Sequence, residues 1–206
     1  MGPRVTAATA DTELPELHFS NAGQPMHAAS FLNPKNHSKQ LMMIRRATQA
    51  DFDAMWPIFR TVVSTGTTYV FAATTDHQTG FAYWFGDGIV TYVAEAGGRI
   101  VGMYKLVANQ RDRGSHVANA SFMVDPACSG LGLGKVMGLH CISEARKAGY
   151  SAVQFNFVVS TNDRAVALWK NLGFAIVGTI PKAFLHQEFG LVDAYVMHRF
   201  LDEDHS

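Results

Sequence analysis

The stretch that decides the fold runs from Phe122 to Lys135 and reads FMVDPACSGLGLGK. An apolar strand ends before a proline, and three alternate glycines then open a helix. These glycines are Gly130, Gly132 and Gly134. Glycine lets the backbone adopt positive φ and pass close to a ligand, and the first N–H groups of a helix are unpaired and carry the positive end of its dipole. The turn is therefore predicted to bind an anion such as a pyrophosphate.

Two other nucleotide-binding patterns do not fit this turn. A Rossmann site has its glycines after the first strand of a βαβ unit, with an acidic residue about twenty positions later. Here the glycines lie past the middle of the chain, behind strands expected at Ile89 to Glu95 and Arg99 to Ala108. The short connection between those strands indicates an antiparallel hairpin. A Walker A loop is excluded because no Gly-Lys-Ser/Thr follows at the required spacing.

On both sides of the turn, capping residues and the pattern of apolar residues predict the remaining helices and strands. Thr48, with Asp51 at the capping-box offset, and Asp76 are expected to begin the first two helices. Two more helices are expected over 132–148 and 162–172, and further strands over 43–46, 116–124, 152–159, 174–179 and 191–200. The order β-α-α-β-β-β-α-β-α-β-β predicts an α/β (α+β) fold with a mixed, mostly antiparallel central sheet flanked by helices.

Three finer expectations concern individual side chains. One apolar stripe of the helix over 132–148 is expected from Val136, Leu139, Ile142 and Ala145. An aromatic cluster suits either the core or a pocket: Tyr69, Phe71, Phe81, Tyr83 and Trp84. A loop before the last strand is expected to hold Phe184, His186 and Phe189.

The first part of the chain differs in composition from the rest. Residues 1–41 contain four prolines, many small polar residues and no sustained apolar period. They are predicted to be a poorly ordered extension or a strap over the domain, which itself is expected to span residues 42–203. A start at Met42 or Met43 would also give a complete domain, so the native status of residues 1–41 stays open. We find no apolar run of signal-peptide or membrane-spanning length and expect a cytoplasmic protein without membrane contact.

Composition excludes several classes of function. Seventeen basic and seventeen acidic residues give a formal net charge of zero, which argues against a nucleic-acid-binding protein. The two cysteines form no CxxC pair and are expected to be free thiols. The nine histidines include no HxH or HExxH spacing, so no metal site is predicted.

Two motifs together resemble the GCN5-related N-acetyltransferase (GNAT) family. In that family a strand, a V-x-P and a Gly-rich turn open one helix, and later an Asn starts a helix that ends in Gly-Phe. Here Val124-Asp125-Pro126 begins the first motif, and Asn162 and Gly173-Phe174 delimit the second. The resemblance covers Met43 to about Leu201. It implies an acyl-CoA N-acyltransferase fold, acetyl-CoA as cosubstrate, and a pantetheine arm held between diverging strands at 116–124 and 152–159.

The resemblance also implies a set of cofactor-binding residues. They are Met123 and Val124 for the pantetheine arm, then Ser129, Gly130, Gly132, Gly134 and Lys135 for the pyrophosphate, and Asn162. Asn162 is equally suited to be a helix N-cap. The sequence departs from the family at two positions. Ser129 replaces the usual Arg or Gln, and Trp169 stands where many members have a Tyr that protonates the departing thiolate, a task an indole N–H cannot perform.

A finer resemblance concerns the acceptor. Scattered segments look like the yeast L-azetidine-2-carboxylate acetyltransferases: Gly80 to Phe85, Ser115-His116, Asn119 to Phe122, Phe155-Asn156, Thr161-Asn162 and Val192 to Ala194. This implies a small imino or amino acid acceptor, held by Asn119 and Asn156. Strand alternation puts Phe155 and Phe157 on one face and Asn156 on the other. A satisfied structural amide network is the alternative interpretation of both asparagines.

The expected reaction is direct transfer from acetyl-CoA to the acceptor nitrogen. Backbone N–H groups near Val124 would stabilise the oxyanion, and the general base would be His116 or a water held by Asn119 and Asn156. His116 also fits a plain strand-end histidine. Two other functions stay open: an acetyltransferase for amines or peptide N-termini, and a non-catalytic CoA-binding sensor. The resemblance further implies a homodimer.

Overall fold

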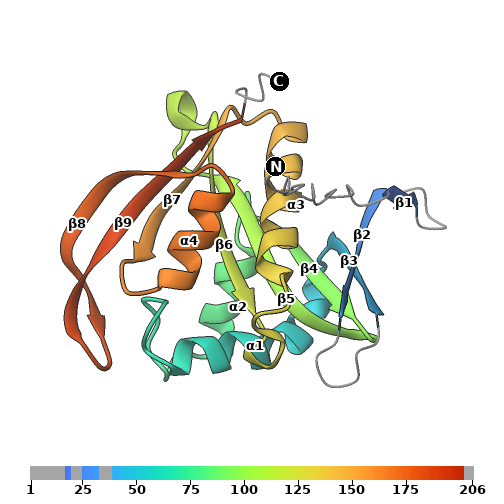
Figure 1. Cartoon of the computed structure of the whole chain (residues 1–206), viewed down its shortest axis with the longest axis horizontal. Helices are drawn as coiled ribbons and strands as arrows, with labels where there is room; N and C mark the ends of the chain where they lie inside the picture. Colours follow the sequence, from blue (N-terminus) through green and yellow to red (C-terminus); the bar gives the residue numbers. More distant parts are fainter. Residues whose placement is uncertain (1–16, 20–24, 33–38, 202–206) are drawn as a thin grey trace, which may run out of the picture.

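The computed structural model describes residues 17–19, 25–32 and 39–201, with side chains from residue 41 onward. Within these ranges the chain forms strands, α-helices and three short 3-10 helices (Figure 1). The strands are β1 (Leu17–Phe19), β2 (Pro25–Leu32), β3 (Lys39–Arg46), β4 (Val90–Ala96), β5 (Arg99–Ala108), β6 (Val117–Val124), β7 (Ala152–Val159), β8 (Ala175–His186) and β9 (Gly190–Phe200). The helices are η1 (Gln49–Asp51), α1 (Phe52–Ser64), α2 (His77–Phe85), η2 (Asp112–Gly114), η3 (Pro126–Cys128), α3 (Leu133–Lys147) and α4 (Asp163–Asn171).

The described strands form one mixed sheet in the order β1-β2-β3-β4-β5-β6-β7-β9-β8. Every described pairing is antiparallel except that of β6 with β7. The predicted fold class and order of elements from residue 43 onward are therefore confirmed. Both predicted caps also form, since Thr48 N–H donates to Asp51 Oδ2 at 2.7 Å and Asp76 Oδ1 accepts from Thr79 N–H at 2.7 Å.

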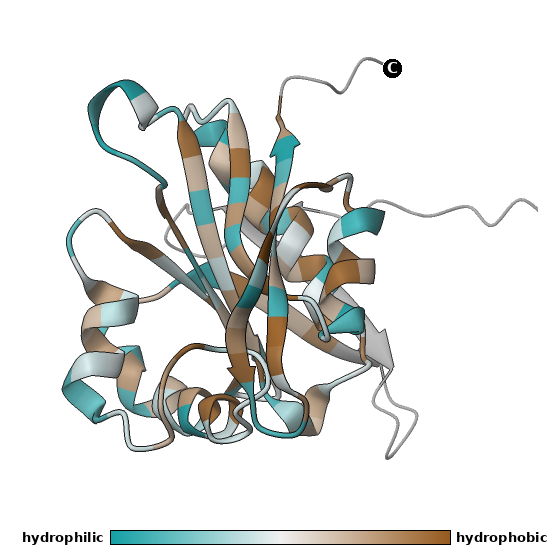
Figure 2. Ribbon diagram, turned by 90° about the vertical axis from the view of Figure 1, so that its left-hand side faces the viewer, coloured by the Kyte–Doolittle hydropathy of each residue, from teal (hydrophilic) through white to brown (hydrophobic). Residues whose placement is uncertain are grey.

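Helices cover both faces of this sheet. Neighbouring residues of β5 point to opposite faces, and Met103 lies in a core with α1 and α2, whereas Tyr104 lies in a second core with α3 and α4. Burial on both faces is seen in β5, which is buried at every position from Val101 to Leu106. Figure 2 shows hydrophobic bands along the central strands, separated by paler and hydrophilic ones. The two cores therefore lie on opposite faces of the central strands.

Strands β6 and β7 pair over only three residues and then diverge. Their register joins Val117, Ala118 and Asn119 to the stretch from Ala152 to Gln154. Beyond Asn119, β6 continues to Val124 without a partner from β7, and α4 lies beside the resulting gap (Figure 1). The diverging strands that the family resemblance implied are thus present.

The predicted apolar stripe of α3 is confirmed at three of its four positions and wrong at the fourth. Ile142 and Ala145 are buried, and Val136 packs partly buried against the core. Leu139, in contrast, is 46% exposed, whereas Met137, which was not predicted, is buried. The buried face of α3 is therefore turned toward Met137, which leaves Leu139 outside it.

The prediction of a loop before the last strand is also wrong for two of its three residues. Phe184 and His186, expected in a loop, belong to β8 and are buried, and β8 forms a long hairpin with β9. Only Phe189 lies in the turn. Strand alternation along β7 is broken as well, because a register shift between Phe155 and Val158 leaves Phe157 at the surface. Such bulges insert a residue and re-aim side chains next to functional sites.

The described parts of residues 1–41 are strands at one edge of the sheet. β2 pairs with β3 in antiparallel register, and β1 pairs with β2. The remainder of the extension lies outside the described residues, so its predicted poor order stays a prediction. Among the described helices, none is both long and apolar enough to cross a membrane.

Candidate active site

The Gly-rich turn forms an open loop between β6 and α3. Gly130 and Gly132 adopt φ of 82° and 79°, in the left-handed region that glycine tolerates best. A Cβ atom at either position would meet no other atom within 4 Å, so these glycines leave free space beside the first turn of α3. Ser129 and Lys135, at the two ends of the loop, are exposed. The loop therefore offers backbone N–H groups and one free lysine to an anion.

Gly134 has a different reason to be glycine. Its Cβ would lie 3.0 Å from Leu168 Cδ2, and a Cβ at Gly138 would lie only 2.5 Å from Leu172 Cδ1. Leu168 lies in α4 and Leu172 directly follows it, so these two glycines let α3 and α4 approach closely. The predicted contact of Gly134 with a pyrophosphate is not needed to explain the residue.

The open edge of β6 presents alternate backbone groups to the gap. Asp125 N–H donates to Val101 O at 2.9 Å, and Asn109 N–H donates to Val117 O at 2.8 Å. Backbone groups point alternately to the two sides of a strand, so those of Met123 are directed toward β5. Those of Phe122 and Val124 face the gap. The family resemblance implied backbone contacts of Met123 and Val124 with the pantetheine arm. The direction of the backbone groups instead makes Val124 and Phe122 available for these contacts.

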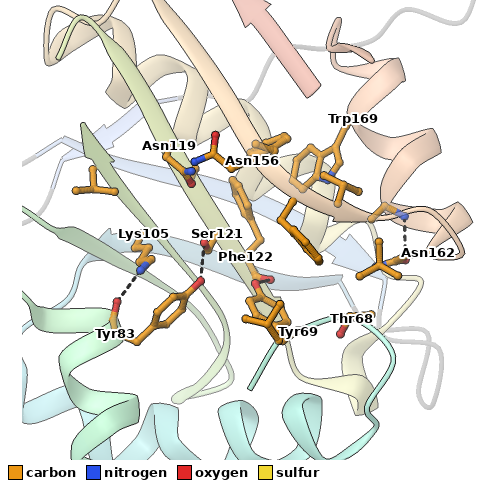
Figure 3. A pocket seen from close by; sticks show the side chains of 18 of the residues that line it. Thr68, Tyr69, Tyr83, Lys105, Asn119, Ser121, Phe122, Asn156, Asn162 and Trp169 are labelled. Atoms are coloured by element: carbon orange, nitrogen blue, oxygen red, sulfur yellow. Dashed lines mark hydrogen bonds between the residues drawn. The ribbon is translucent and has the colours of Figure 1, made fainter. Parts of the chain in front are cut away.

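A cavity of about 400 Å³ lies at the end of this gap (Figure 3). Its wall combines aromatic and aliphatic side chains with polar ones from β5, β6, β7, α4 and the segment between α1 and α2. The polar or hydrogen-bonding side chains are Thr68, Tyr69, Tyr83, Lys105, Asn109, Asn119, Ser121, Asn156, Asn162 and Trp169. Within the part of the chain that the structure describes, no Asp or Glu side chain lines the cavity.

Three asparagines meet on one wall of the cavity. Asn109 Oδ1 accepts from Asn156 Nδ2 at 2.6 Å and from Asn119 Nδ2 at 3.3 Å. Gln154 Nε2 donates to Asn156 Oδ1 at 2.8 Å. The structure thus brings together the two predicted acceptor residues, Asn119 and Asn156, through a third asparagine that the sequence did not single out. The side chains are partly open to the cavity, so the network is both a structural cluster and a polar wall.

Lys105 was also missed, although it lines the cavity. Its side chain is only 7% exposed, and Nζ donates to Tyr83 O at 2.7 Å and lies 3.2 Å from the centre of the Tyr83 ring. Burial lowers the pKa of this amine from 10.5 to about 8. The signal in the sequence was a lone charged residue inside the apolar strand that starts at Arg99.

Two tyrosines supply neutral hydroxyl groups beside Lys105 and β6. Tyr69 Oη donates to Phe122 O at 2.6 Å, and Tyr83 Oη donates to Ser121 Oγ at 2.7 Å (Figure 3). Burial raises the pKa of both phenols, so neither ionises near neutral pH. The bond from Tyr69 confirms that the carbonyl of Phe122 points into the gap.

The aromatic cluster divides between the two expected environments. Tyr69, Phe71 and Tyr83 line the cavity, whereas Trp84 is fully buried in the core with α1. Phe81 packs against that core and does not line the cavity.

Two predicted features of α4 border the cavity at its other end. Asn162 is the N-cap of α4, and its Oδ1 accepts from Ala165 N–H at 3.2 Å. Its N-cap role is confirmed, and a cofactor contact stays a prediction. Trp169 is buried against Phe122 and Phe155, with ring centroids 4.8 Å and 4.5 Å away. Its indole serves mainly as an apolar wall.

His116 lies apart from this constellation. It precedes β6, is exposed, and does not line the cavity. Its backbone carbonyl accepts from Ser151 N–H at 2.9 Å. Cys128, which is a free thiol as predicted, is buried in the loop, and Arg99 Nη2 lies 3.3 Å from its Sγ.

Comparison with known proteins identifies the class. The sequence profile of the Acetyltransferase (GNAT) family matches residues 52–174, and the chain belongs to this family. N-acetyltransferase aca1 of Schizosaccharomyces pombe is 32% identical over 98 residues, which are 47% of this chain and 47% of aca1. The match therefore spans about half the length of that curated relative.

Two solved structures show how far the likeness extends. A GCN5-related N-acetyltransferase from Kribbella flavida is 39% identical, with a TM-score of 0.73, over 77% of this chain and 97% of its own. The yncA protein of Salmonella typhimurium, solved with its cofactor acetyl-CoA, is 26% identical, with a TM-score of 0.70, over 80% of this chain and 96% of its own. The acyl-CoA N-acyltransferase fold implied by the sequence is confirmed.

Proposed function

We propose that the chain transfers the acetyl group of acetyl-CoA to the nitrogen of a small imino or amino acid. The observation that carries the proposal is the cavity at the open end of the β6–β7 gap, which is walled by asparagines and, within the described residues, contains no carboxylate. Family membership and the bound acetyl-CoA of the Salmonella yncA protein support the donor. The acceptor class rests on the cavity.

The residues around the gap fit acetyl-CoA. The open space beside Gly130 and Gly132 can receive the pyrophosphate, which would then contact unpaired N–H groups at the start of α3. Lys135 supplies an exposed positive charge, and Ser129 a hydroxyl group in place of the family's Arg or Gln. Backbone groups of Val124 and Phe122 can bind an extended arm in the way a neighbouring strand would. Asn162, at the N-terminus of α4, would hold that arm from the opposite side.

The cavity residues then position the acceptor. Acetyl-CoA, when bound, supplies a thioester whose carbonyl carbon accepts a nucleophile. The N–H of Val124 faces the gap and can donate to an oxygen that gains negative charge there. The wall of Asn109, Asn119 and Asn156 can hold a water that removes a proton from the acceptor nitrogen. We favour this water over His116 as the base, because His116 lies outside the cavity.

Two alternatives are weaker on the same evidence. An acceptor site for polyamines would need negative charge, yet Lys105 makes this cavity positive. The cavity volume of about 400 Å³ also suits a small molecule better than a peptide chain. The third possibility is a CoA-binding sensor without catalysis, because Ser129 and Trp169 replace the Arg or Gln and the Tyr that are usual in the family. Measurement of acetyl-CoA turnover distinguishes such a sensor from an enzyme.

Thioester turnover tests the proposal. Free CoA released from acetyl-CoA would be measured with a panel of imino acids, amino acids, polyamines and short peptides, and products identified by mass. We expect the imino and amino acids to be consumed with the highest kcat/KM. Consumption of polyamines or peptides alone would overturn the acceptor class. Binding of acetyl-CoA without turnover of any acceptor would support the sensor.

We also propose that two copies of the chain associate. The β8–β9 hairpin carries several large apolar side chains that are exposed, including the cross-strand pair Leu185 and Leu191, 74% and 60% exposed. Exposed apolar patches of this kind commonly mark contacts between proteins. Sedimentation of the wild type and of Leu185→Glu would test this: a dimer that dissociates in the variant is expected, and a monomeric wild type would contradict it.

A further inference from the structure

Lys105 is an unusual residue for the centre of a sheet. It lies on β5 directly opposite Ser121 of β6, and its amine is held at the boundary between the core and the cavity. Taking a lysine amine out of water is unfavourable unless other groups compensate. The compensation on the protein side is small, because it consists of one carbonyl and one aromatic ring, both from Tyr83.

That carbonyl explains how the amine is fixed in place. Tyr83 lies in the last turn of α2, where carbonyl groups lack helical partners and carry the negative end of the helix dipole. An ammonium group has three N–H donors. One donates to Tyr83 O and one direction faces the ring, so hydrogen-bonding capacity is left toward the cavity.

No negative charge balances Lys105 within the described residues. No carboxylate forms an ion pair with it, and the groups beside it are the neutral phenols of Tyr69 and Tyr83 and the hydroxyl of Ser121. Ser121 Oγ accepts from Tyr83 Oη, which leaves its own O–H free to donate. Lys105 and Ser121 thus form a pair of donors on one side of the cavity, with one uncompensated positive charge.

The position of Lys105 and Ser121 relative to α4 indicates how an acceptor would be oriented in the cavity. In Figure 3, Lys105, Tyr83 and Ser121 lie on the opposite side of the view from Asn162 and Trp169, and all five line the same cavity. An acceptor between the two ends would have its nitrogen toward the gap and its far end toward Lys105. The group that fits the far end is an anion.

We propose that Lys105, assisted by Ser121, binds the carboxylate of the acceptor and makes the site selective for acceptors that carry one beside the reacting nitrogen. The proposal rests on the proposed function and deepens it, because it gives the acid group of an imino or amino acid a specific partner. Lys105 is here a substrate-binding residue that contacts the acceptor away from the reacting atoms.

Matched acceptors test this selectivity. Azetidine-2-carboxylate, its carboxamide and unsubstituted azetidine share a ring nitrogen and differ in the charged group. We expect the wild type to prefer the acid over the carboxamide, and Lys105→Met to lower kcat/KM for the acid about 50-fold while changing that for the carboxamide less than about threefold. The ratio between the two enzymes cancels the different basicity of the acceptors. The KM for acetyl-CoA should stay unchanged.

Further variants separate recognition from structure. Lys105→Arg should restore part of the preference for the acid, and Ser121→Ala should reduce it about fivefold. Lys147→Met, at an exposed lysine near the end of α3, serves as the matched control and should leave the acid-to-carboxamide ratio as it is. If Lys105→Met lowers kcat/KM for acid and carboxamide equally, Lys105 only anchors α2 and the proposal is overturned, whereas the acetyltransferase function stands.

A binding measurement keeps the two proposals distinguishable. In thermal unfolding of the full chain without acetyl-CoA, azetidine-2-carboxylate should raise the Tm of the wild type, and its carboxamide should raise it much less. Neither should raise the Tm of Lys105→Gln, which replaces the Met variant if that one fails to fold. Absence of turnover together with this pattern would overturn the proposed function and uphold the role of Lys105; equal shifts by both ligands would overturn the role of Lys105.

Discussion

The two ends of the candidate site offer different kinds of groups to a ligand. At the α3–α4 end, the groups available to a ligand are mainly backbone N–H and C=O groups of Gly130, Gly132 and Val124. At the other end they are side chains of Lys105 on β5, Asn119 on β6 and Asn109, which directly follows β5, and Lys105 is held by a carbonyl of α2. The first end depends on chain conformation, and the second on which side chains the fold brings together.

This difference separates what a family shares from what a member can vary. A cradle of backbone groups tolerates almost any side chain at its exposed positions, so a Ser at 129 in place of Arg leaves its shape intact. A wall of side chains changes its chemistry with each substitution. If the proposed function is correct, the donor is selected by backbone conformation, and the acceptor by a few side chains such as Lys105.

The largest effect that would test the backbone end comes from Gly132→Val. The substitution strains a backbone with φ of 79° and puts a branched side chain into the free space beside α3. We expect the KM for acetyl-CoA to rise about 100-fold, as loss of several charge-assisted hydrogen bonds would require. Steady-state kinetics with acetyl-CoA as the varied substrate gives the measurement.

Gly149→Val is the matched control for strain. Gly149 has φ of 82°, equally open surroundings, and lies at the opposite end of α3. Both variants should lose similar stability, but only Gly132→Val should lose affinity for acetyl-CoA. Equal KM values for the two variants would show that the loop does not bind the cofactor.

The side-chain end is tested by Asn109→Leu, which keeps the size of the residue and removes the shared oxygen. The Nδ2 groups of Asn119 and Asn156 would both lose their acceptor, which leaves amide donors unpaired and the polar wall misplaced. We expect kcat/KM for the acceptor to fall about 30-fold, with the KM for acetyl-CoA unchanged. Asn171→Leu, at an exposed asparagine of α4 outside the cavity, should have no such effect. A rise in the KM for acetyl-CoA would contradict the separation of the two ends.

The same contrast explains how much could be predicted from the sequence. The order of elements and the Gly-rich turn were predictable because local signals, such as the glycines and the caps at Thr48 and Asp76, specify them. The exposure of Leu139 on α3 was not, since Leu139 and Met137 are both apolar and only the packing against the sheet decides which of them is buried. The β7 bulge at Phe155 likewise depends on pairing with a distant strand.

The acceptor wall was predictable only in part for a related reason. Asn119 and Asn156 were found through a family resemblance, but their partner Asn109 lies in a turn-like polar segment without a distinguishing pattern. Lys105 could have been found as a single charge within an apolar strand. Its role required knowledge of the uncharged surroundings, which come from residues 69, 83 and 121.

The charge of Lys105 gives a smaller, pH-dependent effect on stability. Its pKa is about 8 in the folded chain and 10.5 when exposed, so between these values the unfolded chain binds a proton that the folded chain does not. The free energy of unfolding of the wild type should therefore rise with pH relative to Lys105→Met. From pH 7 to pH 9 we expect a gain of about 1 kcal/mol.

Urea unfolding of both proteins at pH 7, 8 and 9 provides this comparison. Other titrating groups, such as Cys141 and Tyr83, are present in both proteins and cancel in the difference. If the difference in the free energy of unfolding between the two proteins stays constant with pH, the amine of Lys105 is solvated. The acceptor end of the site would then contain no buried charge. A difference that grows as predicted would show that the side-chain end retains an unfavourable charge, as expected of a binding site.

The smallest effect concerns the base, and it separates two residues near the start of the same strand. A general base contributes about 10²–10⁴-fold to the rate, so His116→Ala should lower kcat by that factor if His116 is the base. We expect less than a twofold change and the same pH dependence of kcat/KM, because three residues of strand place His116 about 10 Å from Asn119, away from the cavity. Asn119→Ala, measured beside it, should lower kcat/KM clearly. A large loss of kcat in His116→Ala, without a loss in Asn119→Ala, would show that His116 and not a water at the asparagine wall accepts the proton. The reaction would then take place outside the cavity.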